Sequence, residues 1–206
     1  MPGTSLNWLP FNKKIPLIMN NLVYKIELYD FWSTSSGLSG GALADNLCLK
    51  DSNGLPYLPG KTVKGLFREA AEMLLGLKHD GISETFINHV FGEEEGKGDD
   101  NDGGKKTQMA SSFFTNATFN QATAKEITKE LSPLLFEEIA STALEQTGLA
   151  KKYSLRRIQY ALPCTLYGEI LDMAGFTNST MDCAAFIKRL GLNRHRGYGR
   201  CKISIL

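Results

Sequence analysis

The stretch D51-S-N-G-L-P-Y-L-P-G-K-T-V-K-G-L-F-R68 changes its pattern halfway along, and the fold is built around that change. Its first half is rich in turn-forming residues and closes on the pair Pro59-Gly60. From Lys61 onward the apolar residues recur with a period of 3.6 and form one stripe, made of Val63, Leu66, Phe67, Ala70, Ala71, Leu74 and Leu75. The pattern predicts an amphipathic helix from Lys61 to a stop at Gly76.

Alternation of apolar and polar residues predicts β-strands on both sides of this helix. Residues 22–32 alternate in this way and predict a half-buried strand. Residues 111–119 are a second strand candidate. The alternation from Tyr160 to Ile170 predicts one long strand, in which Pro163 marks an edge or a bulge. Residues 201–205 alternate again and predict the last strand.

Three further segments have helical spacing. Residues 86–91 predict a short amphipathic helix, and residues 136–144 predict another. Ser179 and Asp182 resemble a capping box that opens a helix running to Gly191. Strands mixed with helices, without strict alternation, predict an α+β fold with helices on one face of a largely antiparallel sheet.

Length and composition fit a single domain spanning residues 1–206. The chain is 42% hydrophobic and 22% charged, enough to bury a core. No apolar run approaches the ~20 residues that cross a bilayer, and the first residues lack the layout of a secretory signal. We therefore expect a cytoplasmic protein without a membrane partner. The four cysteines and three histidines show no zinc-site spacing, which favours reduced structural thiols.

The net charge of +1 conceals an uneven distribution. Residues 92–104 contain six acids and one lysine, a net of −5, so the rest of the chain carries +6. This composition is typical of a mobile solvated loop, to which we assign residues 92–108. The basic residues elsewhere form three clusters, which favours a shaped groove for an anion over chance grouping of surface charge. The clusters are Lys61, Lys64 and Arg68; Lys151, Lys152, Arg156 and Arg157; and Arg194, Arg196, Arg200 and Lys202.

The first cluster lies at the predicted start of the helix. Pro59-Gly60 leaves the first helical N–H groups and the Thr62 hydroxyl facing an anion. Lys61, Lys64 and Arg68 are spaced i, i+3 and i+7, so they share the face opposite the apolar stripe and can follow a phosphate backbone. A Walker A loop is disfavoured, because no glycine stands five positions before Gly60 and no strand leads directly into it.

The last cluster surrounds the Gly-rich segment N193-R-H-R-G-Y-G-R200. Gly197 and Gly199 allow a ligand to approach the backbone, Tyr198 can stack on a base, and the three arginines can pair with phosphates. The run R196-G-Y-G199 matches only the first half of an RNA-recognition-motif pattern. A plain turn between a helix and the final strand is the alternative interpretation, but three arginines around it favour RNA.

In their order along the chain, these segments resemble the RAMP superfamily (repeat-associated mysterious proteins) of CRISPR effectors. Residues 51–68 are similar to its pattern D-x-x-G-x-P-Y-I-P-G-S-S-L-K-G-x-L-R, and residues 91–92, 113–117, 154–157 and 194–200 give supporting matches. The resemblance covers residues 22–206 and is closest to the backbone subunit of type III (Csm/Cmr-type) complexes. It implies a ferredoxin-like, RRM-related core with a protruding thumb.

The resemblance also implies an activity and partners. That subunit coats the guide part of a CRISPR RNA and cuts the paired target RNA, within an assembly of other subunits and copies of itself. Its cutting acid stands six residues before the turn aspartate, which makes Asp45 the implied catalytic and metal-binding residue and places Asp51 in the turn. A loop with one carboxylate can hold hydrated Mg²⁺, or another divalent cation, and help align the RNA 2′-OH for in-line attack.

Two other functions stay open. One is a non-cleaving RAMP subunit that binds guide RNA and caps or links the filament, in which Asp45 positions the guide or is structural. The other is a guide-processing endoribonuclease that uses His195 in acid-base catalysis. For RNA contact we predict Lys61, Thr62, Lys64, Arg68, Arg194, Arg196, Gly197, Tyr198, Gly199 and Arg200, with Lys151, Lys152, Arg156 and Arg157 as weaker candidates. The prediction requires residues 60–68 and 194–200 to converge into one track beside Asp45.

Overall fold

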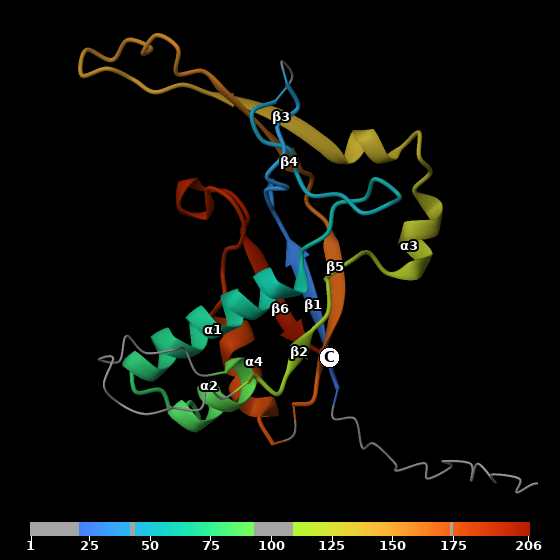
Figure 1. Ribbon diagram of the computed structural model, residues 1–206, viewed down its shortest axis with the longest axis vertical. Coiled ribbons are helices and arrows are strands. Elements are labelled where there is room, and N and C mark those ends of the chain that lie inside the picture. The colour runs from blue at the N-terminus through green and yellow to red at the C-terminus, as the bar shows by residue number, and fades with distance from the viewer. Residues whose placement is uncertain (1–20, 42–43, 93–108, 174) are drawn as a thin grey trace, which may run out of the picture.

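Two antiparallel sheets organise the protein. The computed structural model describes residues 21–41, 44–92, 109–173 and 175–206, so most of the predicted acidic loop lies outside the described residues. A four-stranded core sheet has the order β2-β5-β1-β6, and a two-stranded sheet pairs β3 with β4 and projects from it (Figure 1). The core strands are β1 (Leu22–Leu28), β2 (Phe113–Phe114), β5 (Thr165–Leu171) and β6 (Cys201–Ile205).

Helices α1 (Gly60–Gly76) and α4 (Thr177–Phe186) cover one face of the core sheet, and α2 (Glu84–Phe91) packs against α1. Along the core the chain runs β1-α1-β2-β5-α4-β6, with every neighbouring strand pair antiparallel. This is the ferredoxin-like arrangement, and it confirms the predicted fold class. Along the described residues, no helix is both long enough and apolar enough to span a membrane.

The core lies between α1 and the sheet, where the predicted patterns bury their apolar faces. Tyr24 and Ile26 of β1 are fully buried, as is Phe67 of α1. The Phe67 ring lies 6.5 Å from Tyr24 and 5.5 Å from Phe114 of β2, measured between ring centroids. Gly60 opens α1 because any side chain there would collide with the Phe114 carbonyl oxygen. The Pro59-Gly60 pair is therefore a close-packing site between helix and sheet.

The predicted helix over residues 136–144 is wrong. Residues Phe136–Ser141 form strand β3, which pairs with β4 (Arg156–Ala161) in register from Phe136 opposite Ala161 to Ser141 opposite Arg156. Apolar residues three and four apart fit a helix, but here only Phe136 and Ile139 are half-buried. Backbone pairing with β4, the next strand along the chain, decided the structure, and the local spacing of apolar residues does not encode that pairing.

The single long strand predicted from Tyr160 to Ile170 is also wrong. β4 ends at Ala161 and β5 begins at Thr165, and the two strands belong to different sheets. Pro163 lies at this break, where it has no N–H to donate to a ladder. The chain therefore passes from the projecting sheet into the core sheet at this proline.

Three further boundaries differ from the predictions. Strand β1 ends at Leu28, short of the end predicted at residue 32. Within residues 111–119 only β2 is a regular strand, with single bridges at Ala117 and Thr118. Helix α4 begins at Thr177 and ends at Phe186, and the Ser179 hydroxyl donates to the Gly81 carbonyl instead of capping the helix. The remaining elements are α3 (Gln121–Glu126) and the 3-10 helices η1 (Ser132–Leu135) and η2 (Arg194–Arg196).

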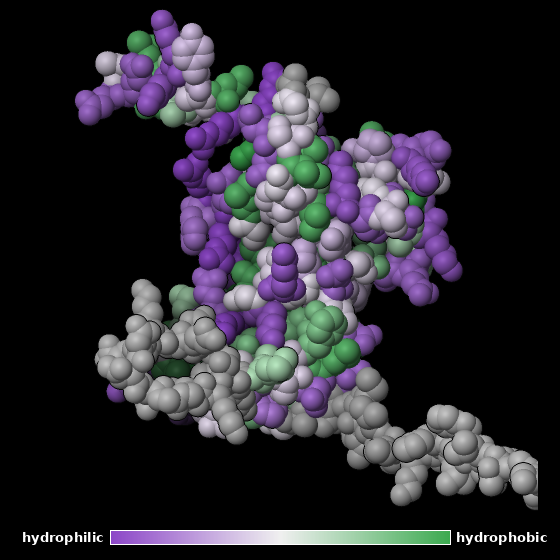
Figure 2. All heavy atoms as spheres, viewed as in Figure 1, coloured by the Kyte–Doolittle hydropathy of each residue, from purple (hydrophilic) through white to green (hydrophobic). Residues whose placement is uncertain are grey.

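The projecting sheet carries an extended hairpin between β3 and β4 (Figure 1). Its tip exposes Leu144 and Leu149, each 68% accessible, and Figure 2 shows hydrophobic and hydrophilic side chains next to each other there. This hairpin corresponds to the protruding thumb that the family resemblance implies.

Candidate functional site

The Gly-rich loop, residues 191–200, is anchored by its two ends to the segment that follows β1. The Leu192 N–H donates to the Ser33 carbonyl and the Gly199 N–H donates to the Phe31 carbonyl, both at 2.8 Å. Gly199 has a φ of 67°, and a side chain there would collide with the Leu190 carbonyl oxygen. Packing thus explains Gly199, which we predicted as an RNA contact. Gly197, with a φ of 97° and open space around it, keeps room for a ligand.

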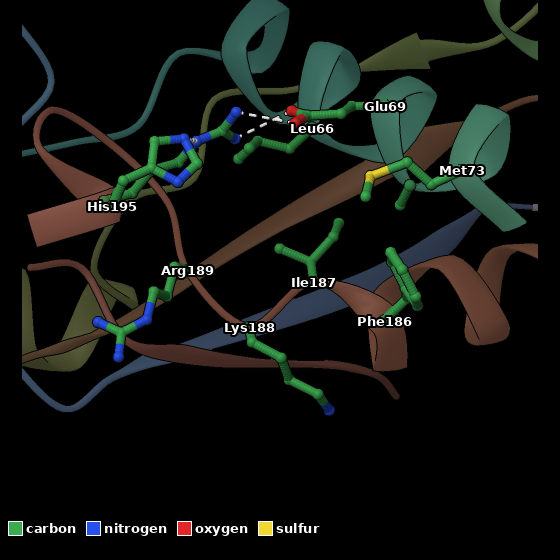
Figure 3. Close-up of a pocket in the computed structure, with 10 residues that line it drawn as sticks. Leu66, Glu69, Met73, Phe186, Ile187, Lys188, Arg189 and His195 are labelled. Atoms are coloured by element: carbon green, nitrogen blue, oxygen red, sulfur yellow. Dashed lines mark hydrogen bonds and ion pairs between the residues drawn. The ribbon is translucent and has the colours of Figure 1, made fainter. Parts of the chain in front are cut away.

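Arg194 connects this loop to α1. Its guanidinium donates to both carboxylate oxygens of Glu69, at 2.8 and 2.9 Å (Figure 3). The Gly-rich loop therefore lies against α1 at Glu69, one residue beyond the segment 60–68 that the track prediction names. The same contact means that Arg194 already has a carboxylate partner where we predicted a phosphate.

Tyr198 and Asn193 connect the loop to β4. The Tyr198 ring stacks on Tyr160 with the ring centroids 4.5 Å apart, and the Asn193 amide donates to the Tyr160 hydroxyl at 2.7 Å. Burial raises the pKa of Tyr160, while the hydrogen bond from Asn193 and the charge of Arg196 act in the opposite direction. One face of Tyr198 is covered by Tyr160, so a base can stack only on its other face.

Asp45 lies at the edge of β4. Its N–H donates to the Arg157 carbonyl at 2.8 Å, and its Oδ2 accepts from the Arg157 N–H at 2.7 Å. The next residue, Asn46, forms a parallel bridge with Ile158. Arg157 and Tyr160 are three residues apart on one strand, about 10 Å at ~3.3 Å per residue. The exposed acid is thus held near the Gly-rich loop, with the exposed side chains of Arg156 and Arg157 on the same strand.

Asp45 offers a divalent cation one exposed carboxylate. Among the described residues, no three His, Cys, Asp or Glu side chains are grouped so that they could hold a metal ion. Mg²⁺ commonly binds through one or two carboxylates together with substrate phosphates and water. Asp45 therefore fits such a cation only where RNA phosphates and water supply its remaining ligands. Asp51, in contrast, accepts the N–H groups of Asn53 and Leu55 at 2.8 and 2.9 Å, as predicted for a turn residue.

The start of α1 is less open than predicted. The Gly60 N–H donates to the Asn116 side chain at 2.9 Å, and the Thr62 and Val63 N–H groups donate to the Pro59 carbonyl. These three N–H groups are therefore satisfied within the protein, which argues against an anion site formed by them. The Thr62 side chain stays a predicted RNA contact, and Lys61 is exposed.

Lys64 and Arg68 both have polar partners within the protein. The Lys64 ammonium donates to the Ser112 carbonyl at 3.3 Å, and burial, followed by the charge of Arg68, lowers the pKa of Lys64. Arg68 donates to Glu72 at 2.7 Å. Lys64 thus contacts the residue just before β2. Its ammonium can contact RNA only if it leaves the Ser112 carbonyl or donates to both groups at once.

Arg200 turns toward another part of the protein. It pairs with Asp30 at 3.4 Å, and its guanidinium lies 5.8 Å from the centre of the Tyr29 ring. These contacts tie it to the segment after β1 and not to α1 or β4. The structure therefore does not bring Arg200 together with Arg194, Arg196 and Tyr198, although all four are close in sequence.

Gly65 is a candidate that the sequence interpretation missed. It lies in the interior of α1 on the exposed side, with open space where a side chain would stand. Glycine there costs about 1 kcal/mol relative to alanine, and no contact in the protein requires it. Its neighbours Lys61 and Lys64 are basic. The sequence already showed a glycine inside a strongly periodic helix pattern. Such a glycine favours the close approach of an external ligand to the helix.

A groove of about 210 Å³ runs between α1 and the end of α4 (Figure 3). Leu66, Met73 and Ile187 give it an apolar lining, and the Glu69–Arg194 pair and His195 lie at one end. The side chains of Lys188 and Arg189 are directed away from Glu69 in Figure 3. The groove thus borders the loop contact, and Lys188 and Arg189 also belong to its lining.

Comparison with known proteins assigns the family. The family model of the RAMP superfamily matches residues 25–202, and the chain belongs to this superfamily. Among solved structures, it is similar to a chain of the type III-B Cmr-beta cryo-EM structure bound to cognate target RNA, with a TM-score of 0.61 and 10% identity over 90% of this chain and 96% of that chain.

A chain of the type III-B Cmr-beta structure in the apo state is similar to the same degree. Its TM-score is 0.62 at 10% identity, over 90% of this chain and 97% of that chain. At this identity the likeness shows a shared fold. No curated protein sequence matches the chain.

Proposed function

We propose that the chain is a CRISPR RNA-binding subunit of a type III effector complex. One observation carries the proposal: the Gly-rich loop contacts α1 through Arg194–Glu69 and β4 through Tyr198–Tyr160, and β4 also holds Asp45. Three segments that are distant in sequence are thereby held next to one another. The family and the likeness to chains of type III-B Cmr-beta structures, one of them bound to cognate target RNA, support this choice of partner.

The exposed groups of this surface suit an RNA backbone. Lys61, Arg156, Arg157 and Arg196 are exposed cations that can pair with successive phosphates, and Gly65 and Gly197 leave room for the strand. Contacts of this kind fix the position of a nucleic acid without reading its sequence. A guide-coating subunit, which accepts guides of any sequence, needs this property.

Binding is tested by titrating the purified chain with single-stranded RNA at several salt concentrations. Arg196→Gln and Arg157→Gln should each weaken binding for all RNA sequences and reduce the slope of log affinity against log salt by about 0.7. Lys129→Gln, on an exposed turn after α3, is the matched control for loss of one positive charge. A loss confined to particular RNA sequences would contradict backbone tracking.

We further propose that Asp45 takes part in cutting guide-paired target RNA together with Mg²⁺ or another divalent cation. Such a cation, when bound, neutralises charge on the scissile phosphate. The Arg157 N–H fixes one carboxylate oxygen of Asp45 and thus orients the side chain. The RNA itself supplies the 2′-OH nucleophile, so the protein has to contribute mainly geometry and charge.

The second candidate function is a non-cleaving RAMP subunit that binds guide RNA at an end of the filament. The hydrogen bond from Arg157 to Asp45 favours it, since that bond gives the acid a structural role on the β4 edge. Asp45→Asn separates the two functions, because asparagine can keep the hydrogen bond while losing the charge. If Asp45 is catalytic, the assembled complex with Asp45→Asn should bind RNA but no longer cut it. If the complex still cuts target RNA, Asp45 is not the cutting acid, and the result favours the non-cleaving subunit.

A further inference from the structure

We propose that Glu69 and Arg194 form a latch that positions the Gly-rich loop, and that Arg194 acts on RNA only through this latch. The inference rests on the proposed RNA binding and deepens it. The two residues are 125 positions apart, yet the guanidinium meets both carboxylate oxygens at 2.8 and 2.9 Å. Paired N–H donors matched to a carboxylate fix orientation as well as distance. The side chains are partly exposed, 47% for Glu69 and 28% for Arg194.

The middle of the loop depends on side chains for its position. Its ends are fixed through Leu192 and Gly199, but η2 between them is flanked by Asn193 and Gly197, both with left-handed backbone. Within residues 193–197, a backbone hydrogen bond runs from the Arg196 N–H to the Asn193 carbonyl. Side-chain contacts therefore hold the turn on two sides: Glu69 on α1, and Tyr160 on β4.

The latch decides where the exposed part of the loop lies. Arg196 and Gly197 follow Arg194 by two and three residues, so displacement of Arg194 displaces both. These two residues are exposed and can contact RNA, whereas Arg194 must leave a bidentate carboxylate to do so. Arg194 is thus a positioning residue. Glu69, an acid within a basic surface, holds Arg194 in place.

The alternative, direct phosphate contact by Arg194, makes the opposite prediction for Glu69→Gln. If Glu69 competes with phosphate for Arg194, removing its charge strengthens RNA binding. If the pair is a latch, Glu69→Gln loosens the loop and weakens RNA binding, although the protein has lost a negative charge. The sign of the change therefore distinguishes the two roles.

The experiment combines hydrogen exchange of the free protein with RNA titration, using Glu69→Gln and the control Glu72→Gln. Glu72 lies three residues further on the same helix and pairs within it, with Arg68. In Glu69→Gln, exchange at the amides of residues 192–199 should accelerate about fivefold, and RNA binding should weaken by about the same factor. In Glu72→Gln, exchange in the loop should stay as in the unmodified protein.

A charge exchange gives a second, independent readout. Glu69→Arg combined with Arg194→Glu restores an ion pair at unchanged net charge, so it should recover much of the slow exchange and of the RNA affinity lost in either single variant. Direct phosphate contact predicts no recovery, because the loop then carries an acid. Recovery supports the latch, and its absence overturns it.

The remaining outcomes are also decisive. Tighter RNA binding by Glu69→Gln, or unchanged exchange in the loop, overturns the latch. Faster exchange with unchanged RNA affinity overturns its positioning role for RNA. If the unmodified protein binds no RNA at low salt while Glu69→Gln still accelerates exchange, the proposed function fails and the latch stands as a structural contact.

Discussion

Gly65 and Gly60 occupy the same helix but have opposite surroundings. Open space lies around Gly65, whereas a side chain on Gly60 would collide with the Phe114 carbonyl oxygen. Glycine is costly inside a helix, so it persists where something else needs the space. At Gly60 the neighbour that needs the space is β2. At Gly65 the described part of the protein has no such neighbour, which favours an approach by RNA.

Gly65→Ala is therefore expected to stabilise the protein and weaken RNA binding. The free energy of unfolding should rise by about 0.5–1 kcal/mol, because alanine loses less backbone entropy on folding. RNA affinity should fall several-fold as the added methyl group meets the strand. Urea denaturation and RNA titration measure the two effects. Gly76→Ala, at the far end of the same helix and also with open space, is the control for stability alone.

The Gly65 prediction has a clear contrary result. If Gly65→Ala and Gly76→Ala both stabilise the protein and both leave RNA affinity unchanged, no strand approaches the exposed face of α1, and the RNA track must exclude that face.

At the scale of elements, the junction between α1 and β2 is a packing constraint. The start of α1 lies against residues 114–116, through the Gly60 backbone and the hydrogen bond to Asn116. The helix approaches the sheet closely here, which lets Phe67 reach both Tyr24 and Phe114. The Pro-Gly punctuation thus serves the fold as well as the helix start.

Gly60→Ala should destabilise the protein, in contrast to the same substitution at Gly65. The new Cβ forces α1 away from Phe114, and overpacking of this kind costs roughly 1–3 kcal/mol. Thermal or urea unfolding checks the difference between the two variants. Equal stabilisation by both alanines would show that α1 can move away from β2 without loss.

At the scale of the whole molecule, Trp32 joins the segment after core strand β1 to the projecting sheet. Trp32, fully buried, forms a bridge with Ala161, and its indole N–H donates to the Leu162 carbonyl at 3.0 Å. The Gly-rich loop adds the Tyr198–Tyr160 stack beside it. The surface proposed for RNA spans this junction, while the hairpin tip lies away from it (Figure 1).

The hairpin tip should be dispensable for folding. Residues 142–155 contribute no member of the buried core among the described residues, and the register of β3 and β4 is complete without them. Replacement of 142–155 by Asn-Gly, a two-residue turn suited to antiparallel strands, should shift Tm by only a few degrees. Calorimetry measures this. A large loss of Tm would show that the tip stabilises the sheet, and reduced assembly at unchanged Tm would assign it to subunit contacts.

Local pattern was sufficient for several elements, and it supplied the residues on which the site prediction rests. The stripe of α1 and the alternation of β1 and β6 predicted those elements, because an amphipathic period states which face is buried. Residues 136–144 were misassigned, because their apolar spacing fits a helix and only pairing with β4 makes them a strand. The residues for the RNA surface were named, but Gly65 and Glu69 were not.

By itself, the sequence determined the α+β class, the family pattern around residues 51–68, and the acid and basic residues that the chain can offer. Only the tertiary structure decided that Arg194 meets Glu69, that Tyr198 stacks on Tyr160, and that Arg200 turns to Asp30. The physical reason is range. Periodicity and turn chemistry act over a few neighbouring residues, whereas these partners are brought together by strand order and by close packing of segments more than thirty residues apart.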